Sequence, residues 1–537
     1  MHHHSTVALL LTLLSLDAAD HQVDVCVYGG TGAGVIAAVA AASEGRSVLI
    51  IEPSRNLGGM TGGGIGTIDY GTRRTIGGLS DRFFAEHHPA GKKPDQAGME
   101  AGLWALAKQH HITVIAEHRL AKVEKHGARI RAITLEYAPP ERYGTPVVQA
   151  LSGPGHTVSA RVFIDAGYEG DLMAMAGVPY ATGREARATY DEPLAGRQPP
   201  VKTYPVDPFR IAGDPTSGLL PGVSADDGLA LGSADDAVPA CNFRLQLSKD
   251  PADRAPFPEF GDYDPAQYEI MGRWFAVRSD APKKLPFAIY NGSEFNDNRD
   301  ELMSLALVGG SKAYLDGDWA TRARVWRDHE RYTVGLFRFL ASDPRVPSDL
   351  RAEAAQWGLR KSAFPKTDGW PHQLYLRQGR RLLGAHVITQ HDLEGRVSVT
   401  DSVGLGSYKV DLYHARRYAM VGATTGGIAI EGKVFTTLGK PGERKAQDNN
   451  GSHIYAIPYR SLTPRVGSVD NLLVPVCLSA SNVAMSSIRM EPVWMLIGEA
   501  AGRAAAQTVA QDCAVQALDV PRLQARLRDC GQVLATE

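Results

Sequence analysis

The sequence is poor in cysteine, with five thiols spread over 537 residues. An odd and sparse set of this kind argues against a disulfide framework. Cys26 and Cys477 lie in apolar, strand-like runs and are expected to be buried thiols. Cys513 and Cys530 flank a short C-terminal helix, where they can pair if the compartment is oxidising, with free thiols as the alternative. The fifth is Cys241.

A strong charge of either sign is also missing. The chain carries 57 Lys and Arg against 59 Asp and Glu, which leaves a net charge of −2. A balance of this kind does not support nucleic-acid binding through a broad basic surface.

Long hydrophobic runs are absent beyond the first residues, so the sequence predicts no internal membrane span. Residues 5–19 form an apolar run that is too short to cross a bilayer and ends in small residues near Ala18 and Ala19. This pattern is typical of a signal peptide, although three histidines replace the usual Lys or Arg before it. We expect export to the periplasm or beyond, with a cytoplasmic location as the alternative.

Several catalytic motifs are lacking as well. G-x-S-x-G, H-E-x-x-H and C-x-x-C do not occur, so a nucleophile elbow and the usual zinc motifs are excluded. His386 and His391 are five residues apart and do not share a helix face, so no metal site is expected there.

The most informative feature that is present is a glycine-rich turn between a strand and a small-residue helix. Residues 23–28 are expected to form a buried strand, residues 29–34 the turn, residues 35–43 a helix and residues 47–52 a second strand. This βαβ order holds the adenosine half of a dinucleotide, because the amides at the helix start attract a diphosphate. Glu52, 18 residues after Gly34, is placed to accept hydrogen bonds from ribose hydroxyls. A plain βαβ crossover is the alternative.

The turn departs from the G-x-G-x-x-G pattern at one position. Thr31 stands where the middle glycine is expected, between Gly30 and Gly32. A threonine makes a close approach of the backbone to a diphosphate harder, whereas the neighbouring glycines keep the loop permissive.

A second glycine-rich segment follows, in which six of the nine residues from Gly58 to Gly66 are glycine. It is expected to lie against a flat ligand that side chains would obstruct, with a flexible loop as the alternative.

The rest of the chain divides by composition. Helices are expected over residues 78–88 and 99–110, a hairpin turning near Gly127, and a strand over residues 160–165. Proline, aspartate and aromatics then rise, and a helix over residues 320–340 buries Trp326, Thr333, Leu336, Phe337 and Leu340. A strand over residues 471–477, a long helix from Glu491 and a last helix over residues 521–530 close the chain.

These motifs, taken in order, resemble the bacterial family called FAD-dependent oxidoreductases, some of whose members are labelled xanthan lyases. The resemblance is carried by VYGGTGAGVIAA, IEPSRNLGGMTGGGIG, VFIDAGYEGDLMAMAGVPY, IPYRSLTP and SSIRMEPVWMLIGEAAG, and it extends from Asp24 to Cys513. It implies an α/β fold: a Rossmann-like FAD-binding domain of the glutathione-reductase type with a large inserted α+β substrate or cap domain. The implied limits are residues 23–180 and 451–515 for FAD binding, 181–450 for the cap and 516–537 for a C-terminal helix, after a signal peptide over residues 1–19.

The resemblance also implies which residues bind FAD. The diphosphate is expected at the first turn, the ribose at Glu52, the flavin and ribityl chain along the second glycine-rich segment, and the adenine side at Ala166 and Gly167. The last group precedes the long C-terminal helix, whose positive end would stabilise a reduced flavin. For Arg489 a structural salt bridge is the alternative. The full set is Gly29, Gly30, Thr31, Gly32, Ala33, Gly34, Glu52, Arg55, Gly58, Gly59, Met60, Thr61, Ala166, Gly167, Ser486, Ile488, Arg489 and Met490.

Oxidation by FAD needs a base near the ring, and histidine is the usual candidate. We expect His386 to be the acid/base and Arg381 to anchor an oxyanion or carboxylate. Tyr408 and His453 are lesser candidates for the catalytic residue. A structural role for His386 is the alternative.

Three functions remain open at this point. The first is a dehydrogenase or oxidase that passes hydride from a small polar molecule, such as a sugar or hydroxy compound, to flavin N5. The second is an FAD monooxygenase or reductase, and the third a non-catalytic nucleotide-binding protein. The substrate, the electron acceptor, the oligomeric state and covalent attachment of FAD are left open.

Overall fold

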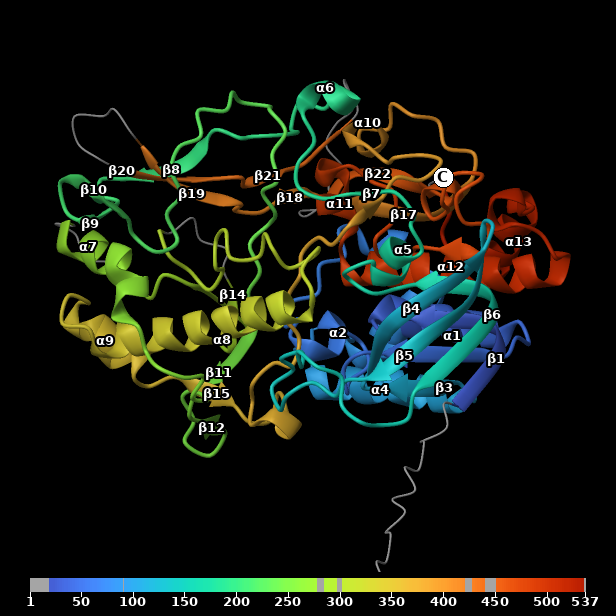
Figure 1. Cartoon of the computed structure of the whole chain (residues 1–537), viewed down its shortest axis with the longest axis horizontal. Coiled ribbons are helices and arrows are strands. Elements are labelled where there is room, and N and C mark those ends of the chain that lie inside the picture. The colour runs from blue at the N-terminus through green and yellow to red at the C-terminus, as the bar shows by residue number, and fades with distance from the viewer. Residues whose placement is uncertain are drawn as a thin grey trace, which may run out of the picture.

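The computed structural model describes residues 19–89, 91–277, 284–296, 302–420, 427–439 and 451–535. Within these residues the chain is an α/β protein whose largest sheet lies beside a second region built from the middle of the sequence (Figure 1). The predicted signal peptide lies outside the described residues except for Ala19, which begins the first strand. No helix in the described part of the chain is long and apolar enough to cross a membrane.

The largest sheet has seven strands in the order β3-β2-β1-β6-β5-β4, with β23 also paired to β6. Five of these strands run parallel to one another: β3, β2, β1, β6 and β23. Strand β5 pairs antiparallel with β6 on one side and with β4 on the other. The strands are β1 (Ala19–Tyr28), β2 (Val48–Glu52), β3 (Thr113–Ala116), β4 (His118–His126), β5 (Arg129–Tyr137), β6 (His156–Asp165) and β23 (Leu472–Leu473). This is a Rossmann-like core, as the sequence predicts.

Helix α1 (Gly32–Ser43) crosses from β1 to β2, and helix α12 (Glu491–Gln511) packs along it. A Cβ at Gly498 would lie 2.3 Å from Ala33 O, and one at Gly502 would lie 2.1 Å from Ala37 O. The small residues of α12 therefore serve mainly a helix–helix contact, although α12 also touches β6 and β1. Figure 1 shows the two helices side by side, blue against red.

The remaining helices of this region follow the predictions with shifted ends. Helix α4 (Gln96–Gln109) begins three residues earlier than expected, because the Asp95 side chain caps it by accepting a hydrogen bond from Gly98 N. Helices α2 (Met60–Gly63), α3 (Gly78–His87), α5 (Asp171–Met175), α11 (Asn482–Ile488) and α13 (Val520–Asp529) complete the set.

The expected strand over residues 471–477 is shorter in the structure, where only Leu472 and Leu473 pair. Pro475 cannot donate to a ladder, and Val474 N instead donates to Leu462 O. All five cysteines are free thiols, so Cys513 and Cys530 do not form a disulfide.

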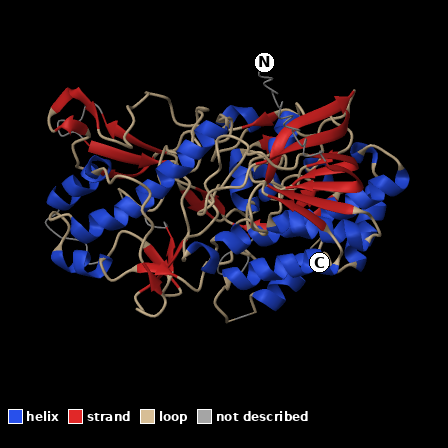
Figure 2. Ribbon diagram, turned by 60° about the horizontal axis from the view of Figure 1, so that its bottom comes forward, coloured by secondary structure: helices blue, strands red, loops and turns tan. Residues whose placement is uncertain are grey.

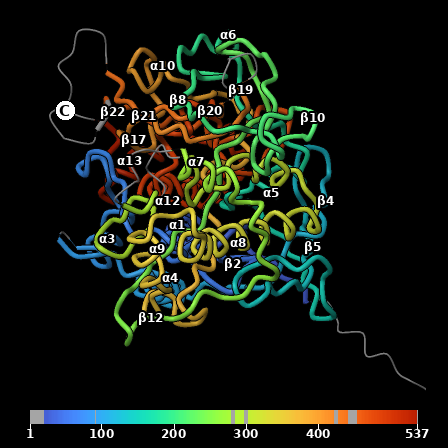
Figure 3. Tube along the Cα trace, turned by 90° about the vertical axis from the view of Figure 1, so that its left-hand side faces the viewer, coloured from blue at the N-terminus to red at the C-terminus, as the bar shows by residue number. Residues whose placement is uncertain are grey.

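The middle of the chain forms small antiparallel sheets and helices at the other end of the molecule. Figure 2 shows its red strands apart from the large sheet, and Figure 3 shows its yellow and green segments nearest the viewer. Helix α8 (Trp319–Ser342) spans the predicted helix and buries all five residues expected on one face. The other helices are α6 (Arg187–Tyr190), α7 (Glu269–Val277), α9 (Ser348–Ala354) and α10 (Gln390–Leu393).

Its main sheet has five strands in the order β12-β15-β11-β14-β13, and a three-stranded sheet has the order β19-β20-β8. The first consists of β11 (Leu245–Ser248), β12 (Arg254–Ala255), β13 (Ala288–Tyr290), β14 (Glu294–Asn296) and β15 (Gly358–Arg360). The second consists of β8 (Pro200–Tyr204), β19 (Arg416–Met420) and β20 (Gly427–Glu431).

Paired strands complete the region. They are β7 (Tyr180–Ala181) with β16 (Arg381–Leu382), β9 (Phe209–Ile211) with β10 (Asp214–Leu219), β17 (Ser402–Tyr408) with β22 (Gly451–Pro458), and β18 (Val410–Leu412) with β21 (Val434–Thr436). Strand β17 also contacts α11 and α12. Residues from the middle and from the C-terminal part of the chain therefore meet there.

Candidate functional site

The first glycine-rich turn joins β1 to α1, and Thr31 is the N-cap of that helix. The Thr31 hydroxyl accepts a hydrogen bond from Gly34 N at 3.1 Å and donates one to Ala166 O at 2.8 Å. The threonine thus caps the helix and ties the turn to the end of β6, where Ala166 and Gly167 lie. This gives a physical reason for the departure from the glycine pattern.

Glu52 ends β2 beside the same turn. Its carboxylate accepts hydrogen bonds from Gly30 N at 2.6 Å and from Ser54 N at 2.7 Å. Burial raises the pKa of Glu52, and these two hydrogen bonds oppose the rise. The side chain is held beside the turn, as the ribose role requires.

A cavity of about 100 Å³ opens next to Glu52 and the helix start. Gly29, Thr31 and Gly167 line it from the large sheet, and Arg119, Trp319 and Trp326 line it from the opposite side.

The second glycine-rich segment continues from this cavity. Gly59 lines the cavity, Gly58 N donates to Gly30 O, and the hydroxyl of Thr61 donates to Glu491 at 2.9 Å. Arg55 turns outward to an ion pair with Glu117, and its side chain is 44% exposed. Of the five residues expected here, Arg55 alone is not brought to the centre.

The glycines further along this segment allow side chains from the middle of the chain to approach. A Cβ at Gly63 would lie 2.6 Å from Gln373 Cβ, and one at Gly64 would lie 3.2 Å from Arg244 Cβ. A Cβ at Gly66 would lie 2.5 Å from Gln246 Nε2. Close packing against these residues accounts for the glycine content of this stretch.

A buried hydrogen-bonded group lies where the starts of α1 and α12 converge. Glu491, the first residue of α12, accepts a hydrogen bond from the Tyr168 hydroxyl at 2.6 Å, and that hydroxyl accepts one from Met60 N at 2.9 Å. A Cβ at Gly32 would lie 3.4 Å from the Glu491 carboxylate. Burial raises the pKa of Glu491 to about 7.

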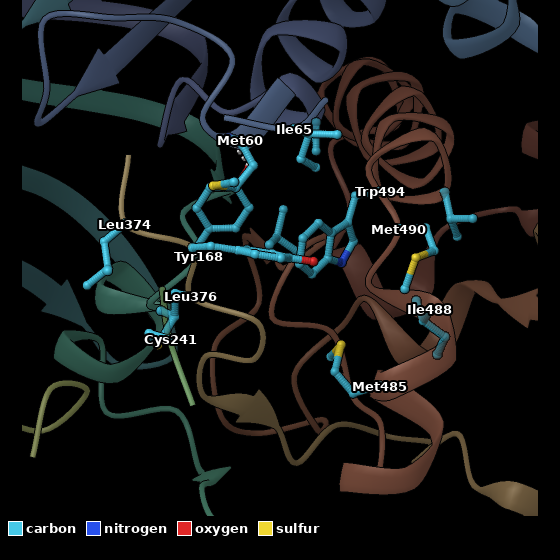
Figure 4. Packing of buried hydrophobic residues seen from close by; sticks show 14 of the residues in the cluster. Met60, Ile65, Tyr168, Cys241, Leu374, Leu376, Met485, Ile488, Met490 and Trp494 are labelled. Atoms are coloured by element: carbon cyan, nitrogen blue, oxygen red, sulfur yellow. Dashed lines mark hydrogen bonds between the residues drawn. The ribbon is translucent and has the colours of Figure 1, made fainter. Parts of the chain in front are cut away.

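Apolar side chains surround this group. Figure 4 shows Met60 and Ile65 from the N-terminal region, Trp494 and Met490 from the C-terminal region, and Leu374 from the middle of the chain around Tyr168. Figure 4 also labels Met485 and Ile488, and these residues are buried. All three parts of the sequence meet at this point.

A second, much smaller cavity, of about 10 Å³, lies beyond Glu491. Ile65, Thr67, Ile68 and Asp69 line it from the glycine-rich segment, Arg244 and Tyr375 from the middle of the chain, and Arg489, Met490, Glu491 and Pro492 from the start of α12. Polar and charged groups therefore face a small enclosed volume.

Asp69 is the group in this cavity with the clearest acid–base character. Burial raises its pKa to about 6, and the nearby Asp411 adds to the rise. Arg244, a hydrogen bond with the Tyr408 side chain and Arg489 act in the opposite direction. The pKa of Tyr408 is raised, chiefly by burial and then by Asp69, so the phenol stays protonated beside the carboxylate.

Two nitrogens of the Arg489 guanidinium are held by hydrogen bonds within the protein, and the third remains to be satisfied. Its Nη1 donates to the Tyr375 hydroxyl at 2.8 Å and its Nη2 donates to Asp411 at 2.8 Å. Its Nε has no hydrogen-bond partner among the residues that the structure describes. The hydroxyl of Ser486 accepts from Asp411 N at 3.2 Å and so supports the same loop.

The structure places His386 and Arg381 elsewhere. His386 Nε2 lies 2.8 Å from Asp392 Oδ1, and Arg381 is buried and paired with Glu185 at 2.5 Å. Neither residue lines the smaller cavity beyond Glu491. Tyr408 is the member of the expected catalytic set that lies beside it.

Asp69, Arg244 and Tyr375 were missed from the sequence. Asp69 carried a usable signal, since it lies only three residues after the glycine-rich segment that was singled out. Arg244 and Tyr375 carried none, because their proximity to Arg489 depends on how the middle of the chain folds back.

The residues present fit FAD. The larger cavity opens on the start of α1 and on Glu52, which suits a diphosphate and a ribose. At the smaller cavity, the unpartnered Nε of Arg489 and the start of α12 supply donors for a carbonyl-bearing ring edge. Both features come from contacts within this chain.

Comparison with known proteins agrees. A family model described as FAD dependent oxidoreductase matches residues 24–527. Among curated proteins none matches the sequence.

Three solved structures show partial similarity. They are the OxyS anhydrotetracycline hydroxylase from Streptomyces rimosus (12% identity, 31% of this chain and 38% of that one, TM-score 0.21), a geranylgeranyl bacteriochlorophyll reductase-like protein from Thermoplasma acidophilum (19%, 30% and 43%, 0.21), and a flavoprotein/dehydrogenase from Cytophaga hutchinsonii (18%, 29% and 42%, 0.22). In each case this chain spans less than half of the solved protein.

The family match covers nearly the whole chain, including both cavities and α12. The cofactor is therefore FAD and the protein is an oxidoreductase. The chain belongs to the family of FAD-dependent oxidoreductases.

Proposed function

We propose that the protein oxidises a small polar substrate, such as a sugar or another hydroxy compound, beside the small cavity that Asp69 lines. The observation that carries the proposal is the position of Asp69, a carboxyl group with a raised pKa that faces this cavity together with Arg489 and Met490. A titratable group in a cavity beside the start of α12 is a candidate for acid–base work.

When bound, FAD would supply the two-electron acceptor for the hydride that leaves the substrate carbon as the alcohol becomes a carbonyl. Asp69 accepts the hydroxyl proton in the same oxidation. Tyr408 is a positioning residue, because its protonated phenol lies beside Asp69 and orients the carboxylate. Tyr375 and Arg244 enclose the substrate from the opposite wall.

We also propose a division of the chain and a location for it. Residues 23–180 and 451–515 bind FAD, and residues 181–450 form the cap that contributes Arg244 and Tyr375. Residues 1–19 direct the chain to the periplasm or beyond. Cell fractionation with and without residues 1–19 tests the last point, and an unchanged location contradicts it.

An FAD monooxygenase or reductase and a non-catalytic nucleotide-binding protein are the competing functions. The test is an anaerobic screen in which sugars, polyols and hydroxy acids are added to the purified yellow protein without NADPH. Loss of the flavin absorbance supports the proposal. Loss that occurs only with NADPH favours the second function, and a protein that stays colourless and takes up no FAD favours the third.

A further inference from the structure

Helix α8 belongs to the middle of the chain, but one of its faces lines the cavity beside Glu52. Trp319, Arg322 and Trp326 all line this cavity. They follow one another at intervals of three and four residues, which is the spacing that places side chains on one face of a helix. In Figure 1 the start of α8 lies at the end far from α9 and points toward the large sheet. A helix of the expected cap therefore forms one wall of the cofactor site.

The opposite wall is the edge of the large sheet where the adenosine half of a dinucleotide binds. Glu52 lines the cavity at the end of β2, Pro53 and Ser54 line it just after, and Gly29 and Thr31 line it at the first glycine-rich turn. In this fold the carboxylate that ends the second strand binds the ribose, and the turn binds the diphosphate. Adenosine bound at Glu52 therefore lies between the sheet and α8.

A buried ion pair holds this face of α8 in place. Arg322 Nη1 and Nη2 donate to the two carboxylate oxygens of Asp171, the first residue of α5, at 2.6 Å and 2.7 Å. Arg380 Nη1 donates to the same carboxylate at 2.8 Å. Because a bidentate pair of this kind fixes orientation as well as distance, α8 is held at the cavity by contacts within the protein.

The loop between β5 and β6 closes a further side of the cavity. Pro146 and Val147 line it from this loop, and the hydroxyl of Thr145 donates to the Glu330 carboxylate of α8 at 2.6 Å. Arg119, which also lines the cavity, donates to Val147 O at 2.6 Å. The sheet edge, this loop and α8 therefore surround the place where adenosine binds.

Trp319 is the residue of this α8 face that keeps part of its surface open. Its side chain is half-buried, whereas Arg322 and Trp326 are each 5% exposed. The guanidinium carbons of Arg119 and Arg322 lie 4.3 Å and 4.9 Å from the centre of its ring and hold the indole in one orientation. A rigid aromatic side chain offers a large contact area at little cost in conformational entropy, so Trp319 is suited to contact a bound ligand.

We propose that α8 covers the adenosine end of FAD, that Trp319 contacts the bound cofactor, and that retention of FAD depends on this cover. Arg322 acts as a positioning residue, because its pair with Asp171 holds the helix there. The inference goes beyond the proposed oxidation, since it concerns how the cofactor is held and not what the protein oxidises.

Release of FAD from the holoenzyme tests the cover, and the rise of flavin fluorescence after dilution measures its rate. Trp319→Ala is expected to raise the rate about tenfold or more, because truncation of an enclosed tryptophan at a binding site commonly has an effect of this size. Trp319→Phe keeps an aromatic ring and is expected to restore most of the retention. The absorption and circular dichroism of the bound flavin are expected to stay unchanged, since Trp319 does not line the smaller cavity at the start of α12. An unchanged release rate in Trp319→Ala overturns the inference.

Trp357→Ala is the matched control. Trp357 is another half-buried tryptophan from the middle of the chain, and Lys249 Nζ lies 4.6 Å from the centre of its ring, but it does not line the cavity beside Glu52. We expect its release rate to equal that of the wild type. Release that is equally fast in Trp319→Ala and Trp357→Ala reflects a general loosening of the fold and overturns the inference.

A proximity measurement on the unsubstituted protein guards against a folding artefact. The holoenzyme is loaded by exchange with 8-azido-FAD, which carries its photoreactive group on the adenine ring, and is then irradiated, digested and mapped by mass spectrometry. Label within residues 319–326 supports the inference, whereas label confined to other segments overturns it. Neither experiment involves a substrate, so a screen that finds no oxidation contradicts the proposed function and leaves this result intact.

Discussion

At the scale of single residues, Asp69 is the side chain on which the proposed chemistry depends. It follows the second glycine-rich segment by three residues, lies beside Tyr408 and faces the same cavity as Arg489. His386, the base expected from the sequence, is paired with Asp392 instead. If Asp69 is the base, replacing Asp69 slows flavin reduction and replacing His386 does not; if His386 is the base, the reverse holds.

Asp69→Asn is expected to slow flavin reduction by substrate by about 100-fold or more, because a positioned general base contributes roughly 10²–10⁴. The yellow colour is expected to stay, since Asp69 is not among the residues expected to hold the diphosphate or ribose. Stopped-flow absorbance under nitrogen measures the rate. His386→Ala and the exposed Asp236→Asn serve as controls, and a loss confined to His386→Ala would refute the assignment of Asp69.

The pH profile of flavin reduction follows from the same group. A base must be ionised, so with a pKa of about 6 the rate is expected to fall about tenfold per pH unit below pH 6 and to level off above it. The pKa of Asp69 is raised from 3.8 to about 6 in the folded protein, so the cost in folding free energy is absent below pH 3.8, grows as pH rises from 3.8 to about 6 and is constant above that. A profile in Asp69→Asn that matches the wild type would exclude this group as its origin.

At the scale of elements, the contact of α1 with α12 fixes the distance between the two cavities. Gly498 and Gly502 let the backbones approach until no side chain fits between them. The two helix starts lie together, since a Cβ at Gly32, just after the N-cap Thr31, would lie 3.4 Å from the carboxylate of Glu491, just after the N-cap Met490.

Gly502→Ala is expected to destabilise the protein by about 1–3 kcal/mol, because the added methyl group overpacks a filled interface. It is also expected to weaken FAD binding, since a shift of α12 moves Arg489 and Glu491 relative to α1. Thermal unfolding and FAD titration measure the two effects. Gly439→Ala is the matched control, because a Cβ at Gly439 meets no atom within 4 Å; equal effects of the two substitutions would contradict the role of the contact.

The sequence predicted these elements well where local rules decide. The strand, turn and helix from residue 23 to residue 43 and the long helix from Glu491 carry strong periodicity, N-terminal signals and small residues. The strand over residues 471–477 was overestimated, because hydrophobicity alone does not reveal that Pro475 breaks the ladder. The site was predicted only in part. Arg244 and Arg489, which both contact Tyr375, are 245 positions apart in the sequence, and no local pattern indicates that they come together.

At the scale of the whole molecule, the cofactor site joins parts of the chain that are far apart in sequence. The larger cavity is lined by Thr31, Gly167 and Trp319, and the smaller one by Asp69, Arg244 and Arg489. A ligand that contacts both cavities therefore connects the large sheet, the middle of the chain and α12. Its removal is expected to loosen all three together.

FAD is accordingly expected to raise the midpoint of thermal unfolding of the deflavinated protein, and by more than ADP does. A ligand that binds the folded state alone stabilises it by about 2.7 kcal/mol at one hundred times its dissociation constant. ADP fills only the cavity beside Glu52 and the start of α1, so we expect it to bind less tightly than FAD. At an equal multiple of its own dissociation constant each ligand gives the same stabilisation. At equal concentration the tighter ligand, FAD, therefore gives more. Differential scanning calorimetry at matched concentrations compares FAD, ADP and riboflavin. If riboflavin raised the midpoint as much as FAD does, the diphosphate end of FAD would contribute nothing to binding. That result would contradict the diphosphate and ribose site that we assign to the capped turn at Thr31 and to Glu52.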